Sequence, residues 1–189
     1  MIDKEKIQGV HEQKPIRGLF EIPLAISKFS GEYSIEKHSR LDFLVLKGPS
    51  GQLGTDQAGY ILGHNPGILD IEFDSILIIG LGLGVIPYVV QDFCSVVDVV
   101  ELQSDVISCV NQLGHLNSNV NLIQGEISAY APTRNYDVIL LDIWYTDITE
   151  ELTDELIEKY SPHLNAGGFL YIPINAGSIE DKVKIYNNN

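Results

Sequence analysis

Three glycines stand at alternate positions in the stretch ILIIGLGLG, residues 76–84. Gly80, Gly82 and Gly84 follow an apolar run typical of a buried strand and precede a segment with helical spacing. A strand that turns through glycines into a helix presents free backbone N–H groups and the positive end of the helix dipole. The pattern predicts a site for a nucleotide-like ligand, although an ordinary strand-to-helix turn would also use such glycines.

One carboxylate lies at the separation from these glycines that a ribose ligand requires. Glu101 closes the next apolar run and follows Gly80 by 21 residues. This separation lets a carboxylate at the tip of the second strand accept hydrogen bonds from a ribose diol held over the glycine turn. Val85 occupies the place where dinucleotide-binding proteins have a third small residue, which speaks against NAD.

Further polar and aromatic residues follow the later predicted strands. Glu126 comes after the third strand, and Asp142, Trp144 and Tyr145 come after the fourth. Ligands in open α/β sheets bind beyond the carboxyl ends of the strands, so these side chains are candidates for one site. Asp142 ends a nearly apolar run and is the candidate catalytic acceptor, with a helix N-cap as the alternative. Trp144 and Tyr145 either line a substrate pocket or cap the edge of the sheet.

The elements that must position these residues alternate along the chain from Ser75 onward. Short β-branched runs predict five strands, at residues 75–80, 96–102, 119–125, 136–144 and 165–174. Helical spacing and turn residues predict helices at residues 85–93, 104–114 and 149–164, with Ser104 as the N-cap of the second. Strands alternating with helices form a parallel sheet with right-handed crossovers. The predicted fold class is therefore α/β, a doubly wound and mostly parallel sheet.

The α/β domain is predicted to span residues 75–189. The regions before its first strand and after its fifth strand show less regular patterns. Residues 1–74 carry short strand-like runs separated by Gly/Pro turns, which predicts a small N-terminal extension of β-hairpin type. After the fifth strand, the run KVKIY either supplies one extra strand or the sheet is truncated.

The amino-acid composition limits the classes of molecule that the protein is expected to bind. The 189 residues are 44% hydrophobic, carry a net charge of −14 and contain no basic run, which argues against nucleic acid. The acidic field suits a neutral or cationic small-molecule substrate, although solubility would explain it equally. Cys94 and Cys109 lack metal spacing and are expected to be reduced core thiols, and no metal site is predicted. We expect a cytoplasmic protein without a membrane segment, and leave a homodimer open.

From about Ser75 to Ile174 the sequence resembles the class I S-adenosylmethionine-dependent methyltransferase superfamily, and within it the spermidine synthase-like branch. The stretches ILIIGLGLG, VVDVVELQSDVI, NVNLIQGEISAY, YDVILLDIW and LNAGGFL carry the resemblance. It implies a Rossmann-like methyltransferase fold and S-adenosylmethionine, or its decarboxylated form, as the cofactor. The cofactor-binding residues that it implies are Gly80, Gly82, Gly84, Glu101, Gln103, Glu126 and Gln52. It also places Asp142 where aminopropyltransferases keep an amine-activating aspartate. The run DIWY, residues 142–145, loosely resembles the D-P-P-Y motif of amino-group methyltransferases. This resemblance implies that Asp142, Trp144 and Tyr145 contact the substrate and that Tyr145 is a further catalytic candidate.

The sequence differs from the spermidine synthase-like branch at two places that concern substrate binding. The aminopropyltransferase signature has a second aspartate after the fourth strand, where this chain has Ile143, Trp144 and Tyr145. Leu62 stands where a polyamine-binding acid would be. The function expected is a transferase that acts on a small amine or another small nucleophile. The alternatives are a non-catalytic protein that binds an adenosyl ligand and a divergent polyamine aminopropyltransferase.

Overall fold

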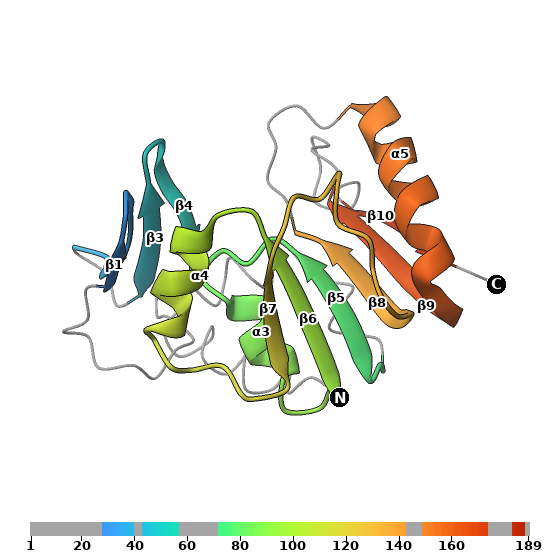
Figure 1. Cartoon of the computed structure of the whole chain (residues 1–189), viewed down its shortest axis with the longest axis horizontal. Coiled ribbons are helices and arrows are strands. Elements are labelled where there is room, and N and C mark those ends of the chain that lie inside the picture. The colour runs from blue at the N-terminus through green and yellow to red at the C-terminus, as the bar shows by residue number, and fades with distance from the viewer. Residues whose placement is uncertain (1–27, 40–42, 57–71, 143–148, 174–182, 188–189) are drawn as a thin grey trace.

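The structure, a computed structural model, describes residues 28–39, 43–56, 72–142, 149–173 and 183–187. These residues form a small antiparallel sheet and a larger, mostly parallel sheet with helices packed against it (Figure 1). The strands of the larger sheet are β5 (Ser75–Ile79), β6 (Val96–Glu101), β7 (Val120–Gln124), β8 (Tyr136–Leu141), β9 (Leu164–Pro173) and β10 (Val183–Asn187).

The order of the strands in the larger sheet confirms the doubly wound class. The sheet runs β10-β9-β8-β5-β6-β7. Strands β5 to β9 are parallel, and β10 is antiparallel to β9. The run KVKIY therefore supplies an extra edge strand. Chain order reverses between the neighbours β5 and β8, and this reversal is where open α/β sheets leave a crevice for ligands.

The helices are shorter than the sequence pattern predicts. They are α3 (Val85–Val90), α4 (Ser104–Asn111), α5 (Glu150–Tyr160) and the 3-10 turn η2 (Ser161–His163). The prediction that Ser104 caps α4 is wrong, because Gln103 holds the extended N-cap conformation and Ser104 is already helical. At α5 the cap is Thr149, whose hydroxyl accepts a hydrogen bond from the Leu152 N–H. The N-cap alternative for Asp142 is therefore wrong for this helix.

The parallel sheet is buried on both faces, as its nearly continuous apolar strands require. On one face, Ile76 and Ile78 pack in a cluster with Val106 and Val110 of α4. On the other face, the apolar cluster includes Leu77, Ile79, Leu141, Leu156 and Tyr160, the last two from α5. Helices α4 and α5 therefore cover opposite faces of the sheet.

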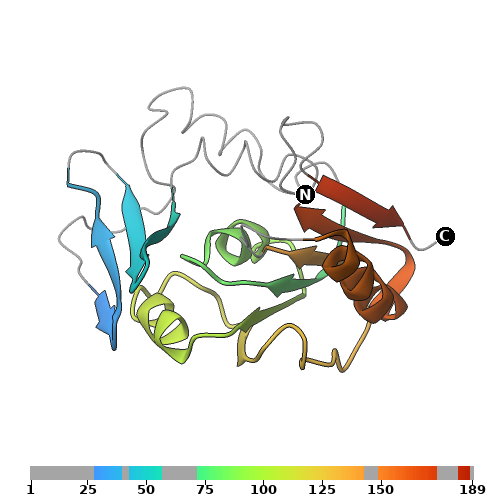
Figure 2. The same cartoon turned by 90° about the horizontal axis from the view of Figure 1, so that it is seen from above.

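The N-terminal part is larger than the predicted hairpin. Strands β1 (Lys28–Ser30), β2 (Tyr33–Lys37), β3 (Leu44–Gly48) and β4 (Gly51–Thr55) form an antiparallel meander. Figure 2 shows it beside α4, at the end of the molecule opposite to β9 and β10. Ser30 Oγ donates to Asp105 Oδ1 of α4 at 2.6 Å, and Gln112 Nε2 donates to the Phe29 carbonyl at 3.2 Å. These contacts fix the small sheet against the larger domain.

Both cysteines are free and buried. Burial raises the pKa of the Cys94 thiol to about 12 and also raises the pKa of Cys109. Within the described ranges, no three His, Cys, Asp or Glu side chains are placed to hold a metal ion. None of the helices in this part of the chain has the length and apolar character needed to cross a membrane.

Candidate ligand site at the carboxyl edge of the parallel sheet

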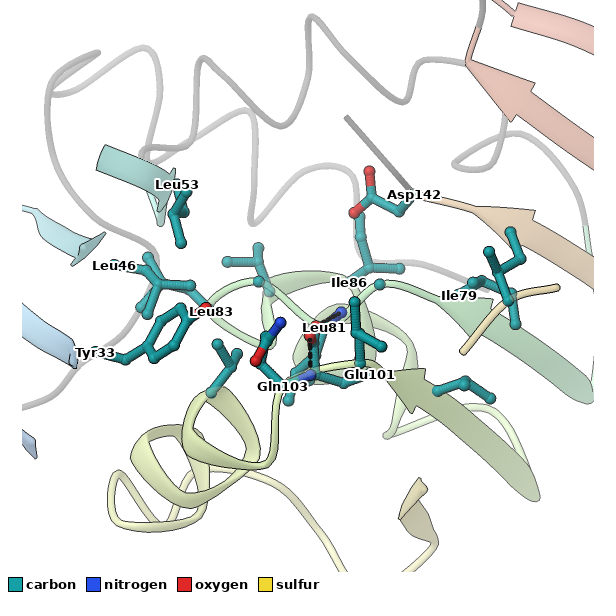
Figure 3. Close-up of a pocket in the computed structure, with 18 of the residues that line it drawn as sticks. Tyr33, Leu46, Leu53, Ile79, Leu81, Leu83, Ile86, Glu101, Gln103 and Asp142 are labelled. Atoms are coloured by element: carbon teal, nitrogen blue, oxygen red, sulfur yellow. Dashed lines mark hydrogen bonds between the residues drawn. The ribbon is translucent and has the colours of Figure 1, made fainter. Parts of the chain in front are cut away.

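A cavity of about 290 Å³ opens where β5, β6, β7 and β8 end (Figure 3). Its floor is the glycine turn after β5, and its remaining walls come from the tips of the neighbouring strands and from the small sheet. The lining residues that sequence reasoning named are Gly80, Gly82, Glu101, Gln103, Glu126 and Asp142. The fold therefore brings these residues to one site at the edge of the sheet.

The three glycines of the turn adopt conformations that side chains rarely take. Their φ angles are +103° at Gly80, +51° at Gly82 and +75° at Gly84. A Cβ atom added to Gly82 would meet no atom within 4 Å, and this residue lines the cavity. A Cβ added to Gly84 would lie 3.0 Å from Val110 Cγ1 and 3.2 Å from His115 Nε2. Gly82 thus leaves space beside the cavity, whereas Gly84 allows the turn to pack against α4 and His115.

His115 packs against the glycine turn, a contact that the sequence does not predict. Its ring lies 5.7 Å from that of Tyr88 in α3, and its carbonyl accepts a hydrogen bond from Gln91 Nε2. Burial lowers the pKa of His115 to about 4, although contacts with the backbone of Gly84 and Leu83 act in the opposite direction. His115 is therefore neutral at physiological pH and packs against the glycine turn.

Glu101 joins the tip of β6 to the glycine turn. Its Oε2 accepts a hydrogen bond from the Leu81 N–H at 3.0 Å, and its Oε1 accepts one from the Gln103 N–H at 2.8 Å. Each carboxylate oxygen can accept a second hydrogen bond. Figure 3 shows these two bonds at the centre of the site. The backbone fixes the carboxylate in place, with acceptor capacity remaining on both oxygens.

The tips of β6 and β7 carry the same pair of residue types, an acid followed by an aliphatic residue. Leu102 follows Glu101, and Ile127 follows Glu126; all four line the cavity. Leu102 is 50% exposed despite its apolar side chain. Glu126 Oε1 accepts a hydrogen bond from Ser128 Oγ at 2.7 Å. This part of the cavity offers apolar surfaces beside hydrogen-bond acceptors.

Asp142 directly follows β8 and is half-buried in the cavity wall. In Figure 3 it lies across the glycine turn from Leu53 of the small sheet. Trp144 and Tyr145 lie outside the described residues. Gln52 is exposed on β4, and the cavity is lined by the three residues after it rather than by Gln52 itself. Its predicted cofactor contact remains a prediction.

The small sheet contributes lining residues that sequence reasoning missed. They are Tyr33, Leu46, Leu53, Gly54 and Thr55. The sequence carries no signal for them, because their role depends on how the meander docks against α4. The only ionisable side chains that line the cavity besides Tyr33 are Glu101, Glu126 and Asp142, among the residues that the structure describes. This acidic lining disfavours a pyrophosphate and suits a cationic or neutral ligand.

Fold and site thus define a doubly wound α/β protein with an acidic ligand cavity at its topological switch point. No protein-family model and no curated protein matches the sequence. The chain is similar to many solved structures, including the following three. The first is the plantazolicin methyltransferase BpumL in complex with a triazolic desmethylPZN analog and SAH, at 27% identity over 56% of this chain and 40% of that one, with a TM-score of 0.45.

The second is the N-methyltransferase NodS from Bradyrhizobium japonicum WM9 in complex with S-adenosyl-L-homocysteine, at 18% identity over 59% of this chain and 56% of that one, with a TM-score of 0.47. The third is CalS10 with bound SAM, an amino pentose methyltransferase from Micromonospora echinaspora. It is 19% identical over 60% of this chain and 46% of that one, with a TM-score of 0.45. The chain thus spans between 40% and 56% of the length of these proteins.

Proposed function

We propose that this protein binds S-adenosylmethionine and transfers its methyl group to a small amine. The observation that carries the proposal is Glu101, whose two oxygens are fixed by the N–H groups of Leu81 and Gln103 beside an open glycine turn. A ribose diol needs two adjacent acceptors in a fixed orientation, and this carboxylate provides them. The methyltransferase-like sequence motifs and the strand order point to the same ligand.

The residues present fit this cofactor in shape and in charge. Gly82 leaves room for close approach to the turn, and Leu102 and Ile127 offer apolar surfaces to a purine ring. Glu126 would accept a hydrogen bond from the purine amino group. S-adenosylmethionine carries a positive sulfonium, a positive ammonium group and one carboxylate, and its net positive charge is favoured by the acidic lining. A dinucleotide would bring two negative phosphates to the same carboxylates.

When bound, this cofactor supplies an activated methyl group, whose bond electrons stay with sulfur while the lone pair of the nucleophile forms the new bond. The protein's contribution is to position the nucleophile. Asp142 would accept a hydrogen bond from the N–H of an amine and stabilise the positive charge that develops on its nitrogen. Trp144 and Tyr145 remain predicted substrate contacts, with Tyr145 also a predicted catalytic residue.

Three more specific predictions from the sequence remain proposals. These are the spermidine synthase-like branch, aminopropyl transfer from the decarboxylated cofactor, and a binding protein that has lost catalysis. The first two would need a further acid for a polyamine. This chain has Tyr145 where the aminopropyltransferase signature has its second aspartate after Asp142. Methyl transfer to a smaller amine is therefore the simpler proposal.

Thermal unfolding with a panel of ligands tests this proposal. S-adenosylmethionine, S-adenosylhomocysteine, decarboxylated S-adenosylmethionine and NAD are each added at saturating concentration. A ligand at 100 times its Kd stabilises the folded state by about 2.7 kcal/mol, which corresponds to a rise in Tm of roughly 5–11 °C for a chain of this size. We expect the adenosyl compounds to raise the Tm and NAD to leave it unchanged. A rise with NAD alone, or with none of the four, would contradict the proposal.

A further inference from the structure

The wall of the cavity opposite Asp142 belongs to the small N-terminal sheet. Strand β4 runs directly against the glycine turn, since a Cβ added to Gly54 would lie 3.9 Å from the Leu83 backbone nitrogen. Leu46, Leu53 and Tyr33 line the cavity from the same sheet. This sheet is therefore a structural wall of the site, held in place by the contacts of β1 and β2 with α4.

The side chains of this wall are mainly apolar. Leu53 is 43% exposed, although its side chain packs over Gly48. A Cβ added to Gly48 would lie 2.7 Å from Leu53 Cδ1 and 2.8 Å from Tyr33 Cε1. The absence of a side chain at Gly48 thus lets Leu53 and Tyr33 share one surface. An exposed aliphatic surface at a cavity gains free energy when an apolar ligand group covers it.

The carboxylates that line the cavity come from the larger sheet. The lining residues from the small sheet include no acid, lysine or arginine, whereas Glu101, Glu126 and Asp142 follow or end strands β6, β7 and β8. Figure 3 shows Leu53 and Asp142 on opposite sides of the glycine turn. Under the proposed function, Glu101 and Glu126 hold the adenosyl group, so Asp142 is the carboxylate left to a second ligand.

We infer that the small sheet selects the acceptor, and that this acceptor is a monoamine with an apolar body. The amine nitrogen faces Asp142, and the apolar body lies on the wall of Leu53, Leu46 and Tyr33. A second ammonium group, as in a diamine, would lose its hydration against this wall without gaining a partner. A carboxylate at the far end would meet the acidic field of the cavity. The inference rests on the proposed function and names its substrate class.

Binding of three probes of equal length to the protein saturated with S-adenosylhomocysteine tests the inference. The probes are n-hexylamine, 1,6-diaminohexane and 6-aminohexanoate, each titrated calorimetrically. We expect n-hexylamine to bind at least tenfold more tightly than the other two. Leu53→Glu should reverse the preference between n-hexylamine and 1,6-diaminohexane, because it places a carboxylate where the second ammonium lies.

Phe29→Glu is the matched control variant. Phe29 is an exposed aromatic residue of the same sheet, 62% accessible, and does not line the cavity. We expect its probe preferences to equal those of the wild type. If S-adenosylhomocysteine does not bind, the proposed function fails and the inference fails with it. If it binds but the three probes bind equally or not at all, or if Leu53→Glu behaves like Phe29→Glu, the inference alone is overturned.

Discussion

Replacing Glu101 by Gln is expected to weaken both ligand binding and the fold, because this carboxylate has two roles. It accepts hydrogen bonds from the N–H groups of Leu81 and Gln103, and it is the proposed acceptor for the ribose hydroxyls. A carboxamide has one accepting oxygen and one donating NH₂ group. Whichever way it is oriented, one of the two backbone N–H groups loses its acceptor and faces a donor.

The size of both effects follows from these contacts. A hydrogen bond to a charged group contributes about 1.5–3 kcal/mol, and the lower end applies where water can replace the lost partner, as at the exposed Gln103 N–H. We expect Glu101→Gln to reduce the free energy of unfolding by about 1–2 kcal/mol, or roughly 2–8 °C in Tm. Loss of a charged acceptor for the ribose should reduce affinity for S-adenosylhomocysteine by about 1–3 kcal/mol, or roughly 5- to 150-fold.

Thermal unfolding and calorimetric titration of the same preparation separate the two effects. Glu126→Gln is the control, because Glu126 accepts its hydrogen bond from the Ser128 hydroxyl and not from the glycine turn. The control should lose affinity with little change in Tm. An unchanged Tm in Glu101→Gln would refute the structural role of the carboxylate. Unchanged affinity in the folded variant would refute its assignment to the ribose.

Three further predictions concern the turn and the buried polar groups. Gly82→Ala should reduce affinity for S-adenosylhomocysteine more than tenfold. The positive φ angles of Gly82 and Gly84 strain an alanine at either position, but Gly84→Ala should lower the Tm more, because its Cβ would also press on Val110 and His115. Equal effects of the two variants in both assays would contradict the division of roles. Tyr136→Phe should lower the free energy of unfolding, measured in urea, by about 1.5–3 kcal/mol. The reason is that the Tyr136 hydroxyl donates a hydrogen bond of 2.6 Å to Asp98, which is 4% exposed. A loss below about 0.5 kcal/mol would argue against a stabilising role for this hydrogen bond. Burial alone would raise the pKa of Asp137, but hydrogen bonds from Asn165, the Asp74 N–H and Ser75 together lower this pKa from its ordinary value. The stability that this carboxylate contributes is present above its unfolded pKa and is lost as pH falls through its folded pKa. The wild type should therefore lose more unfolding free energy than Asp137→Asn between about pH 5 and pH 3, and parallel pH profiles would count against the shift.

The parallel sheet could be predicted because its strands are buried on both faces. Runs such as SILII and YDVILL are almost continuously apolar and end at glycine or at a charged residue. The predicted and observed bounds of these strands therefore agree within three residues, and the residues after them meet at one edge. Their convergence follows from the parallel direction of the strands and needs no knowledge of side-chain contacts.

The small sheet and the second role of Glu101 could not be predicted in the same way. Strand β4, with the sequence GQLGT, lacks both alternation and β-branched residues apart from Thr55, so local propensity gives little indication of a strand. Its place in the cavity wall depends on the docking of β1 and β2 against α4. The bond of Glu101 to the Leu81 N–H depends on the conformation of the glycine turn, which has positive φ angles at Gly80, Gly82 and Gly84. Both features arise from tertiary structure.

A crystal structure of the protein with S-adenosylhomocysteine tests the central claim most directly. The account predicts the ligand across the glycine turn, with its ribose hydroxyls donating to the oxygens of Glu101 and its purine between Leu102 and Ile127. The Leu81 and Gln103 N–H groups should keep their bonds to Glu101 in the complex. Ligand bound elsewhere on the protein, or bound in the cavity without contact between the ribose and Glu101, would contradict the account.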